Sequence, residues 1–224
     1  MSAAAIFVMV PAAAAAEVGA AISLFNDYRF RGYTLSNGRP VAIFDIGYDA
    51  PNGIYGAISG SLVASDGDGI QPLRLAINGG YATPLFRGVA ADIGIVHARY
   101  SSYSGLASDR SYSEAYVGVS DKTVGARLSL SPDYLGTSRW TLHAAINARK
   151  AISSTLAIDG ELGSLFPLGG GYSRGRWDAR AGLSQRIGRI SLHAAVTARA
   201  KSANAYIARY HHPTAFIIGI SSPL

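Results

Sequence analysis

The sequence of 224 residues contains no cysteine, and only 15% of its residues are charged. Without cysteine there is no disulfide framework and no thiolate for zinc binding or nucleophilic catalysis. Disorder requires low hydrophobicity and high charge, whereas this chain is 49% hydrophobic. No apolar run reaches the roughly 18 residues, free of charge and clustered glycine, that a transmembrane helix needs. These absences exclude a disulfide scaffold, a disordered chain and a helical membrane protein.

The net charge of +6 comes from 20 basic and 14 acidic residues. An excess of basic residues can indicate nucleic-acid binding when Lys and Arg gather in a stripe or patch. Here the basic residues outside the predicted strands, such as Lys122, Lys150, Lys201 and Arg209, are scattered over loops and turns. We therefore expect no nucleic-acid partner.

The first residues have the composition of an export signal. An apolar run at residues 3–10 is followed by Pro11 and then by alanines up to Ala16, which form an Ala-x-Ala site ahead of Glu17. No Lys or Arg precedes the apolar run, so we expect the n-region to be truncated. The alternative is an Ala-rich first helix of the mature protein. We expect residues 1–16 to be a signal peptide and residues 17–224 to form one domain.

The rest of the chain alternates with a period of two residues rather than with the period of a helix. Leu142, Ala144 and Ile146, for example, alternate with His143 and Ala145. Most predicted strands have about 9–12 residues, as a tilted membrane-spanning strand requires, whereas strands of soluble sandwiches typically have about 5–6. The predicted strands are residues 19–30, 40–50, 54–64, 72–83, 88–99, 111–120, 123–131, 139–149, 154–165, 176–185, 189–199 and 214–222.

Long and short connections alternate along the chain. This alternation is typical of outer-membrane barrels, which have long external loops and short periplasmic turns. Together with the export signal and strand length, it predicts an all-β fold: a transmembrane antiparallel up-and-down β-barrel of about 12 strands, with both termini on the periplasmic side. A soluble periplasmic β-protein is the alternative, because the period of two fits both. The long connections are residues 31–39, 65–71, 100–110, 132–138, 166–175 and 200–213.

Aromatic residues cluster near both ends of the predicted strands. In membrane barrels such rings form girdles at the two lipid–water interfaces, although Tyr is also simply a good strand residue. Near the long loops we place Tyr28, Phe30, Tyr33, Tyr100, Tyr103, Tyr134, Trp140, Phe166, Tyr172 and Trp177. Near the short turns we place Tyr48, Tyr55, Tyr81 and Phe86.

Charged residues occupy the face opposite the apolar one; Leu73 and Leu75, for example, are predicted to flank Arg74 on the opposite face. A charge facing the middle of the lipid costs about 2–4 kcal/mol, so these side chains are expected to face the lumen. A barrel of 8 strands is filled by side chains and one of 16–18 encloses a channel, so the lumen is either a narrow water-filled path or a plug of salt bridges. The candidate pore-lining residues are Asp27, Arg29, Arg31, Asp45, Arg74, Asp92, Glu114, Arg127, His143, Arg149, Asp159, Glu161, Asp178, Arg180, His193 and Arg199.

The stretch from Asn26 to Gly32 (NDYRFRG), with the later Leu35-Ser36-Asn37-Gly38-Arg39-Pro40, resembles the opening of the TorF-family porins of proteobacteria. Further similarity lies in Gly47-Tyr48-Asp49, Gly53-Ile54-Tyr55-Gly56 and Ser59-Gly60-Ser61, so that the match covers roughly residues 22–65 and is diffuse beyond. The resemblance implies an outer-membrane β-barrel porin without catalytic residues. The chain departs from the family at Leu75-Ala76-Ile77-Asn78, where an acidic residue is frequent, and in ending Ser222-Pro223-Leu224 rather than in an aromatic residue.

Catalytic and metal chemistry find little support in the residues. Twelve-stranded outer-membrane phospholipases use a Ser and a His within a His-x-Ser-Asn-Gly-like motif, and none of His97, His143 and His193 is followed by such a Ser. The adjacent His211 and His212 lack a third ligand nearby and are expected to be solvated. Residues 66–69 (DGDG) lack the later ligands of a Ca²⁺ loop and are expected to form a turn-rich loop.

The sequence thus predicts an outer-membrane porin, a passive channel for small hydrophilic solutes or ions, with no cofactor, no metal and no enzymatic activity. Its partners are outer-membrane lipid and the solutes, and its oligomeric state is left open. Two alternatives remain: a non-conducting barrel with a structural or adhesive role, and a lipid-modifying barrel enzyme.

Overall fold

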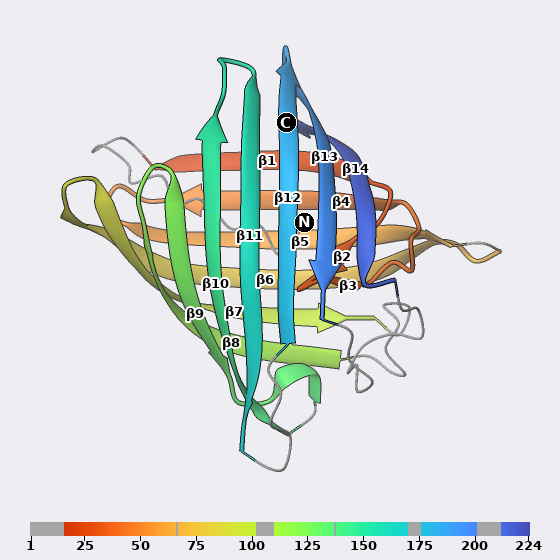
Figure 1. Cartoon of the computed structure of the whole chain (residues 1–224), viewed down its shortest axis with the longest axis horizontal. Helices are drawn as coiled ribbons and strands as arrows, with labels where there is room; N and C mark the ends of the chain where they lie inside the picture. Colours follow the sequence, from red (N-terminus) through yellow and green to blue (C-terminus); the bar gives the residue numbers. More distant parts are fainter. Residues whose placement is uncertain (1–15, 66, 102–109, 137, 170–175, 201–211) are drawn as a thin grey trace.

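In the computed structural model, twelve antiparallel strands close into a barrel (Figure 1). The structure describes residues 16–65, 67–101, 110–136, 138–169, 176–200 and 212–224. Around the wall the strands follow the order β1-β14-β13-β12-β11-β10-β9-β8-β7-β6-β5-β4, so the first wall strand pairs with the last. The predicted twelve-stranded up-and-down barrel is confirmed.

The predicted strand ends agree with the observed ones within three residues everywhere except at the end of the first strand. A separate two-stranded sheet and one 3₁₀ turn, η1 (Tyr134–Gly136), complete the structure. No helix among the described residues is long and apolar enough to cross a membrane. The wall strands are β1 (Glu17–Phe25), β4 (Val41–Asp49), β5 (Ile54–Ser65), β6 (Gly69–Phe86), β7 (Val89–Tyr100), β8 (Arg110–Ser120), β9 (Val124–Ser131), β10 (Trp140–Ala151), β11 (Leu156–Leu168), β12 (Arg176–Ile187), β13 (Ile190–Arg199) and β14 (Thr214–Pro223).

The outer face of the barrel is apolar at mid-strand. Ile77, Ile95 and Leu162 point outward and are 54%, 67% and 65% exposed. Monomeric soluble proteins rarely expose a contiguous apolar surface of this extent. The period of two that predicted the strands therefore separates an apolar outer face from a more polar inner face.

The prediction of two outer aromatic girdles is only partly correct. Trp140 and Trp177 are half-exposed on the outer face near the long connections, and Tyr48 and Tyr81 are exposed near the short turns. Other predicted girdle rings are buried inside the barrel, because their strand positions share the inner face or because their segment folds inward. Tyr103 and Tyr172 lie outside the described residues. The rings found inside are those of Tyr28, Phe30, Tyr33, Tyr55, Tyr100 and Tyr134.

The connection between β8 and β9 is one of the short turns, closed by a side chain. The carboxylate of Asp121 accepts hydrogen bonds from the backbone N–H of Val124 at 2.7 Å and of Thr123 at 2.6 Å. These bonds favour the charged form and hold the pKa of Asp121 below its usual range.

The hairpin of β5 and β6 differs from the prediction in length and register. The strands continue to Ser65 and from Gly69, so most of the predicted loop at residues 65–71 is strand; Asp66 lies outside the described residues. A register shift opposite Ser61 turns Leu73 into the barrel, where it is fully buried next to Arg74. The expectation that Leu73 shares the outer face with Leu75 was wrong, because a bulge breaks the period of two.

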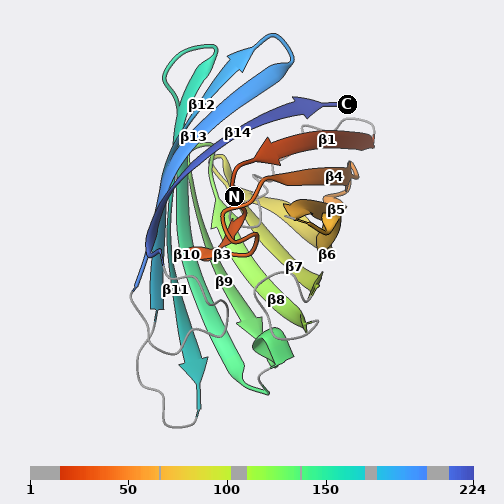
Figure 2. The ribbon, with the colours of Figure 1, turned by 90° about the vertical axis from the view of Figure 1, so that its right-hand side faces the viewer.

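The first strand was predicted to run to residue 30, but β1 ends at Phe25. Asn26 closes it by pairing with β14: its Oδ1 accepts from the backbone N–H of Ile218 at 2.9 Å, and its Nδ2 donates to the carbonyl of Phe216 at 3.2 Å. The following residues, 26–40, turn into the barrel and are called the inner loop below. Figure 2 shows the inner loop between the two sides of the wall.

Candidate functional site: the barrel interior

The inner loop contains its own small hairpin of β2 (Arg29–Phe30) and β3 (Tyr33–Thr34). The turn between them needs left-handed backbone, with φ of 49° at Arg31 and 76° at Gly32. Glycine adopts this conformation without steric cost. Charged and aromatic residues alternate at positions 27–30 as they would in a wall strand. In the inner loop, however, both kinds of side chain are buried.

Asp27 holds the inner loop in shape. Its Oδ2 accepts a charged hydrogen bond from Arg29 Nε at 2.8 Å. Its Oδ1 accepts from the hydroxyls of Thr34 at 2.6 Å and Ser36 at 2.8 Å, and from the backbone N–H of Gly38 at 3.2 Å. Asp27 is 4% exposed, so one buried carboxylate joins the start, middle and end of the loop.

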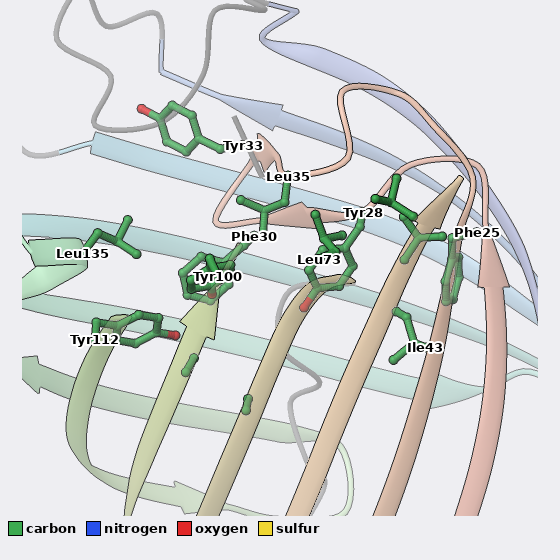
Figure 3. Close-up of a cluster of buried hydrophobic side chains, with 14 of the residues drawn as sticks. Phe25, Tyr28, Phe30, Tyr33, Leu35, Ile43, Leu73, Tyr100, Tyr112 and Leu135 are labelled. Carbon is green, nitrogen blue, oxygen red and sulfur yellow. The ribbon is translucent and has the colours of Figure 1, made fainter. Parts of the chain in front are cut away.

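Aromatic rings fix the inner loop against the wall, as Figure 3 shows. The Phe30 ring lies 6.2 Å from that of Tyr100 on β7 and 5.8 Å from that of Tyr112 on β8. Tyr112 also contacts Tyr134 of η1 at 5.5 Å. Leu35 is fully buried in the same cluster. Ring pairs at these distances add to the stabilisation from burial alone.

The tip of the inner loop reaches two distant parts of the wall. On one side, Arg31 Nη2 donates to both carboxylate oxygens of Glu114 on β8, at 2.7 and 2.9 Å. On the other side, a Cβ on Gly32 would lie 2.7 Å from the Cβ of Arg199 on β13 and 3.2 Å from that of Asp178 on β12. The inner loop therefore starts at β1 and crosses the lumen to β8, β12 and β13.

A second polar cluster lies toward the short-turn end of the interior. Asp92 on β7 receives Arg127 Nη2 at 2.8 Å and the hydroxyl of Tyr55, which is itself 2.5 Å from the hydroxyl of Tyr116. The guanidinium of Arg127 lies over the Tyr116 ring at 4.2 Å. The four side chains come from β5, β7, β8 and β9, so the cluster joins neighbouring strands from inside.

Two glycines provide the room for the tyrosines of this cluster. A Cβ on Gly80 would collide with the Tyr55 hydroxyl, and one on Gly94 with the Tyr116 hydroxyl. Aromatic side chains that cover strand glycines in this way help to set strand register.

The opposite side of the interior carries further pairs. Arg180 on β12 forms an ion pair with Asp159 on β11, and Arg149 on β10 donates to the Ser184 hydroxyl at 3.2 Å. His193 Nε2 lies 2.8 Å from the hydroxyl of Ser221. This side of the lumen therefore carries cationic, anionic and hydroxyl side chains together.

His143 and Asp178 approach each other across β11, with Nε2 and Oδ2 3.8 Å apart. Gly163 lies between them, and a Cβ there would be 2.8 Å from both atoms. We expect Gly163→Ala to lower the free energy of unfolding by about 1–3 kcal/mol, because added volume in a packed interior forces displacement. Urea unfolding of the refolded barrel measures this change. The control is Gly160→Ala on the same strand, whose Cβ meets only the carbonyl of Arg180 at 3.5 Å, and equal losses would contradict the prediction.

All the predicted pore-lining residues have side chains directed into the barrel. Two of them, Asp27 and Arg29, were placed on a wall strand and instead belong to the inner loop, because β1 ends early at Phe25. Arg31, which was placed in the long connection after that strand, also lies in the inner loop. The others occupy inner positions of wall strands, among them Asp45, which alternates with the exposed Phe44 and Ile46, and Glu161. That these residues line a conducting path stays a prediction. The expected loop histidine His211 lies outside the described residues.

The sequence analysis missed the interior tyrosines. Tyr112 and Tyr116 lie two residues before and after Glu114 on β8, so their side chains point to the same face of the strand. The alternation in the sequence could therefore have placed both tyrosines inside the barrel. Tyr55 was assigned to a girdle, because a ring near a strand end fits either face. Hydroxyls on this inner face make the interior a mixed aromatic and charged surface rather than a purely ionic one.

Known structures with a similar fold include porins. The NanC porin superposes with a TM-score of 0.63 at 11% identity, covering 92% of this chain and 100% of that chain. The KdgM porin gives a TM-score of 0.57 at 11% identity, covering 90% and 98%. A structure of the KdgM porin in complex with disordered oligogalacturonate gives 0.55 at 11% identity, covering 92% and 98%. At these identities the likeness concerns the fold, which is that of an outer-membrane porin-like barrel.

At the level of sequence, no curated protein matches the chain. A family model described as "Bacterial protein of unknown function (Gcw_chp)" matches residues 10–209. This match covers most of the chain, including the inner loop and the wall strands up to β13. The protein therefore belongs to the bacterial family Gcw_chp.

Proposed function

We propose that this protein is an outer-membrane channel that lets small hydrophilic solutes or ions diffuse passively, with the inner loop as its constriction. The observation that carries the proposal is a closed barrel whose outer face is apolar while its inner face carries paired charges and hydroxyls. An apolar exterior suits lipid, and a polar interior suits water and solutes. The fold likeness to the KdgM and NanC porins and the resemblance of residues 22–65 to the TorF-family porins support the same function.

Single-channel recording in planar bilayers tests the proposal. Purified, refolded protein is expected to give discrete conductance steps that are small, because the inner loop crosses the lumen. Heat-modifiable migration on a gel, with faster migration of the unboiled protein, checks first that the barrel has folded. Folded protein that gives no conductance steps would overturn the channel.

The second candidate is a non-conducting barrel with a structural or adhesive role. The observation that favours it is the inner loop itself, which is buried between β8 on one side and β12 and β13 on the other. In this case the same recordings show no steps even after the loop is shortened, whereas a constricted channel opens further.

A location in the outer membrane predicts that a charge placed on the outer face destabilises the barrel. We expect Ile95→Arg, at the middle of β7, to lower the free energy of unfolding from lipid vesicles by about 2–4 kcal/mol, because the charge faces the bilayer midplane. The control is Val18→Arg at the start of β1, near a strand end, where the same charge costs about 0–1 kcal/mol. Urea titrations in vesicles measure both values. Equal effects of the two substitutions would argue against a membrane-embedded outer face.

A further inference from the structure

The apolar outer face is interrupted by polar residues on β7 and β8 toward the long-loop end. His97 and Arg99 lie on the same face of β7 as the outward-pointing Ile95, and all three side chains are exposed. The register partners of His97 and Arg99 on β8 are Ser113 and Ser111, which are also exposed. The four polar residues are called the outer patch below.

The strands on either side of the outer patch are apolar at the same level. On β6, the register partners of Arg99 and His97 are Leu75 and Ile77, which point outward and are exposed. On the other side, β9 carries Leu130 near the same end of the barrel. The outer patch is therefore flanked by apolar surface and is not continued by the neighbouring strands.

Strand register places the outer patch near the level of Trp140. Ala115 on β8 pairs with Leu130 on β9, which pairs with Leu142 on β10. Ser113 is the next residue on the same face after Ala115 toward the long loops, as Trp140 is after Leu142. Trp is enriched where lipid meets water. The outer patch therefore faces the headgroup region rather than the middle of the acyl chains.

His97 and Ser113 leave a hydrogen-bond donor for a further group. His97 Nδ1 lies 3.0 Å from the Ser113 hydroxyl, and the pair makes no other side-chain hydrogen bond among the described residues. A neutral imidazole and a hydroxyl each carry one polar hydrogen. One of these hydrogens is used between the two side chains, so the other is left over whichever tautomer His97 adopts. Arg99 interacts with another residue, but a guanidinium has five N–H donors and this interaction need not use them all.

We propose that the outer patch binds the phosphate group of a lipid in the outer leaflet. The phosphate oxygens accept hydrogen bonds from the His97–Ser113 pair and from Arg99, and the acyl chains lie along the apolar surface of β6 and β9. Hydrogen bonds to a charged phosphate are about twice as strong as bonds between neutral groups, so a phosphate is held more tightly than a hydroxyl. Such binding requires a barrel embedded in the membrane, but it does not require an open lumen.

Native mass spectrometry of the folded barrel in detergent micelles tests the outer patch, with phosphorylated lipid A as the probe and dephosphorylated lipid A for comparison. The wild type is expected to retain the phosphorylated lipid and not the other. His97→Leu combined with Ser113→Ala should weaken lipid binding about tenfold, as the loss of one hydrogen bond to a charged group implies. Both substitutions place apolar side chains on an apolar face, so the barrel should still fold.

The control is Lys150→Leu, which removes an exposed cation at the short-turn end of β10 and should leave lipid binding unchanged. Four results would each overturn the proposed lipid site: no retained lipid, equal binding of the two lipids, no effect of the double variant, or equal weakening by the control. Displacement of the lipid by inorganic phosphate at equal concentration would overturn it in favour of a soluble anion. A barrel dimer that the double variant dissociates would overturn it in favour of an interface between two copies. None of these results bears on the channel, which the bilayer recordings test separately.

Discussion

A variant in which residues 28–37 are replaced by a short glycine–serine linker is expected to conduct several times more current per barrel than the wild type. The inner loop crosses the lumen between β1, β8, β12 and β13, and its buried side chains occupy space that water would otherwise fill. The wall does not depend on the loop, because β1 and β4 pair directly with each other along their whole length. The measurement is single-channel conductance in planar bilayers.

The matched control replaces residues 66–68 between β5 and β6 with the same linker. This connection is at the same end of the barrel as the inner loop, but it joins two strands that extend beyond their neighbours. Its replacement should leave conductance unchanged. If the inner-loop variant shows the wild-type conductance, the loop is not the constriction; if it shows none, the interior is closed by the wall residues themselves.

Asp27→Ala is expected to lower the free energy of unfolding by about 3–5 kcal/mol, because removing one partner of a buried ion pair leaves the other charge unpaired. The charge left behind is that of Arg29, whose side chain is 6% exposed. The hydroxyls of Thr34 and Ser36 lose their acceptor as well. Urea unfolding of the barrel, followed by tryptophan fluorescence, gives the change in free energy.

Asp45→Ala is the control for this substitution. Asp45 points into the same lumen from β4 but is only partly buried, so its removal should cost much less. Conductance of the Asp27→Ala variant provides a second measurement. An inner loop without the hydrogen bonds of Asp27 should give larger or noisier conductance steps than the wild type. Equal losses of stability for the two variants would show that Asp27 does not organise the loop.

The wall of this barrel could be predicted from the sequence, because alternation and connection lengths are local properties of the chain. Register was harder: the bulge that turns Leu73 inward has no local signal, since Leu73 and Leu75 fit the same apolar pattern. The inner loop was missed for a related reason. Residues 27–30 alternate as a strand does, and only contacts with distant partners such as Glu114 and Tyr112 show that they leave the wall.

The interior charges could be predicted as a set but not as pairs. The alternation of side chains along each strand places Asp92, Arg127 and Glu114 on the inner face. The ion-pair partner of each depends on strand register and on the inner loop. Arg31 could not be paired with Glu114 from sequence, because 83 residues separate them along the chain.

The two ends of the inner loop are neighbours in the wall, since Phe25 and Val41 are register partners of β1 and β4. A segment held at two adjacent points can change length and composition without moving any ladder hydrogen bond between the strands. Selection can then alter the contents of the lumen while the shell stays constant. Relatives of this protein could thus differ in what fills the lumen through one exchangeable stretch of sequence, much as antibodies vary their loops on a fixed framework.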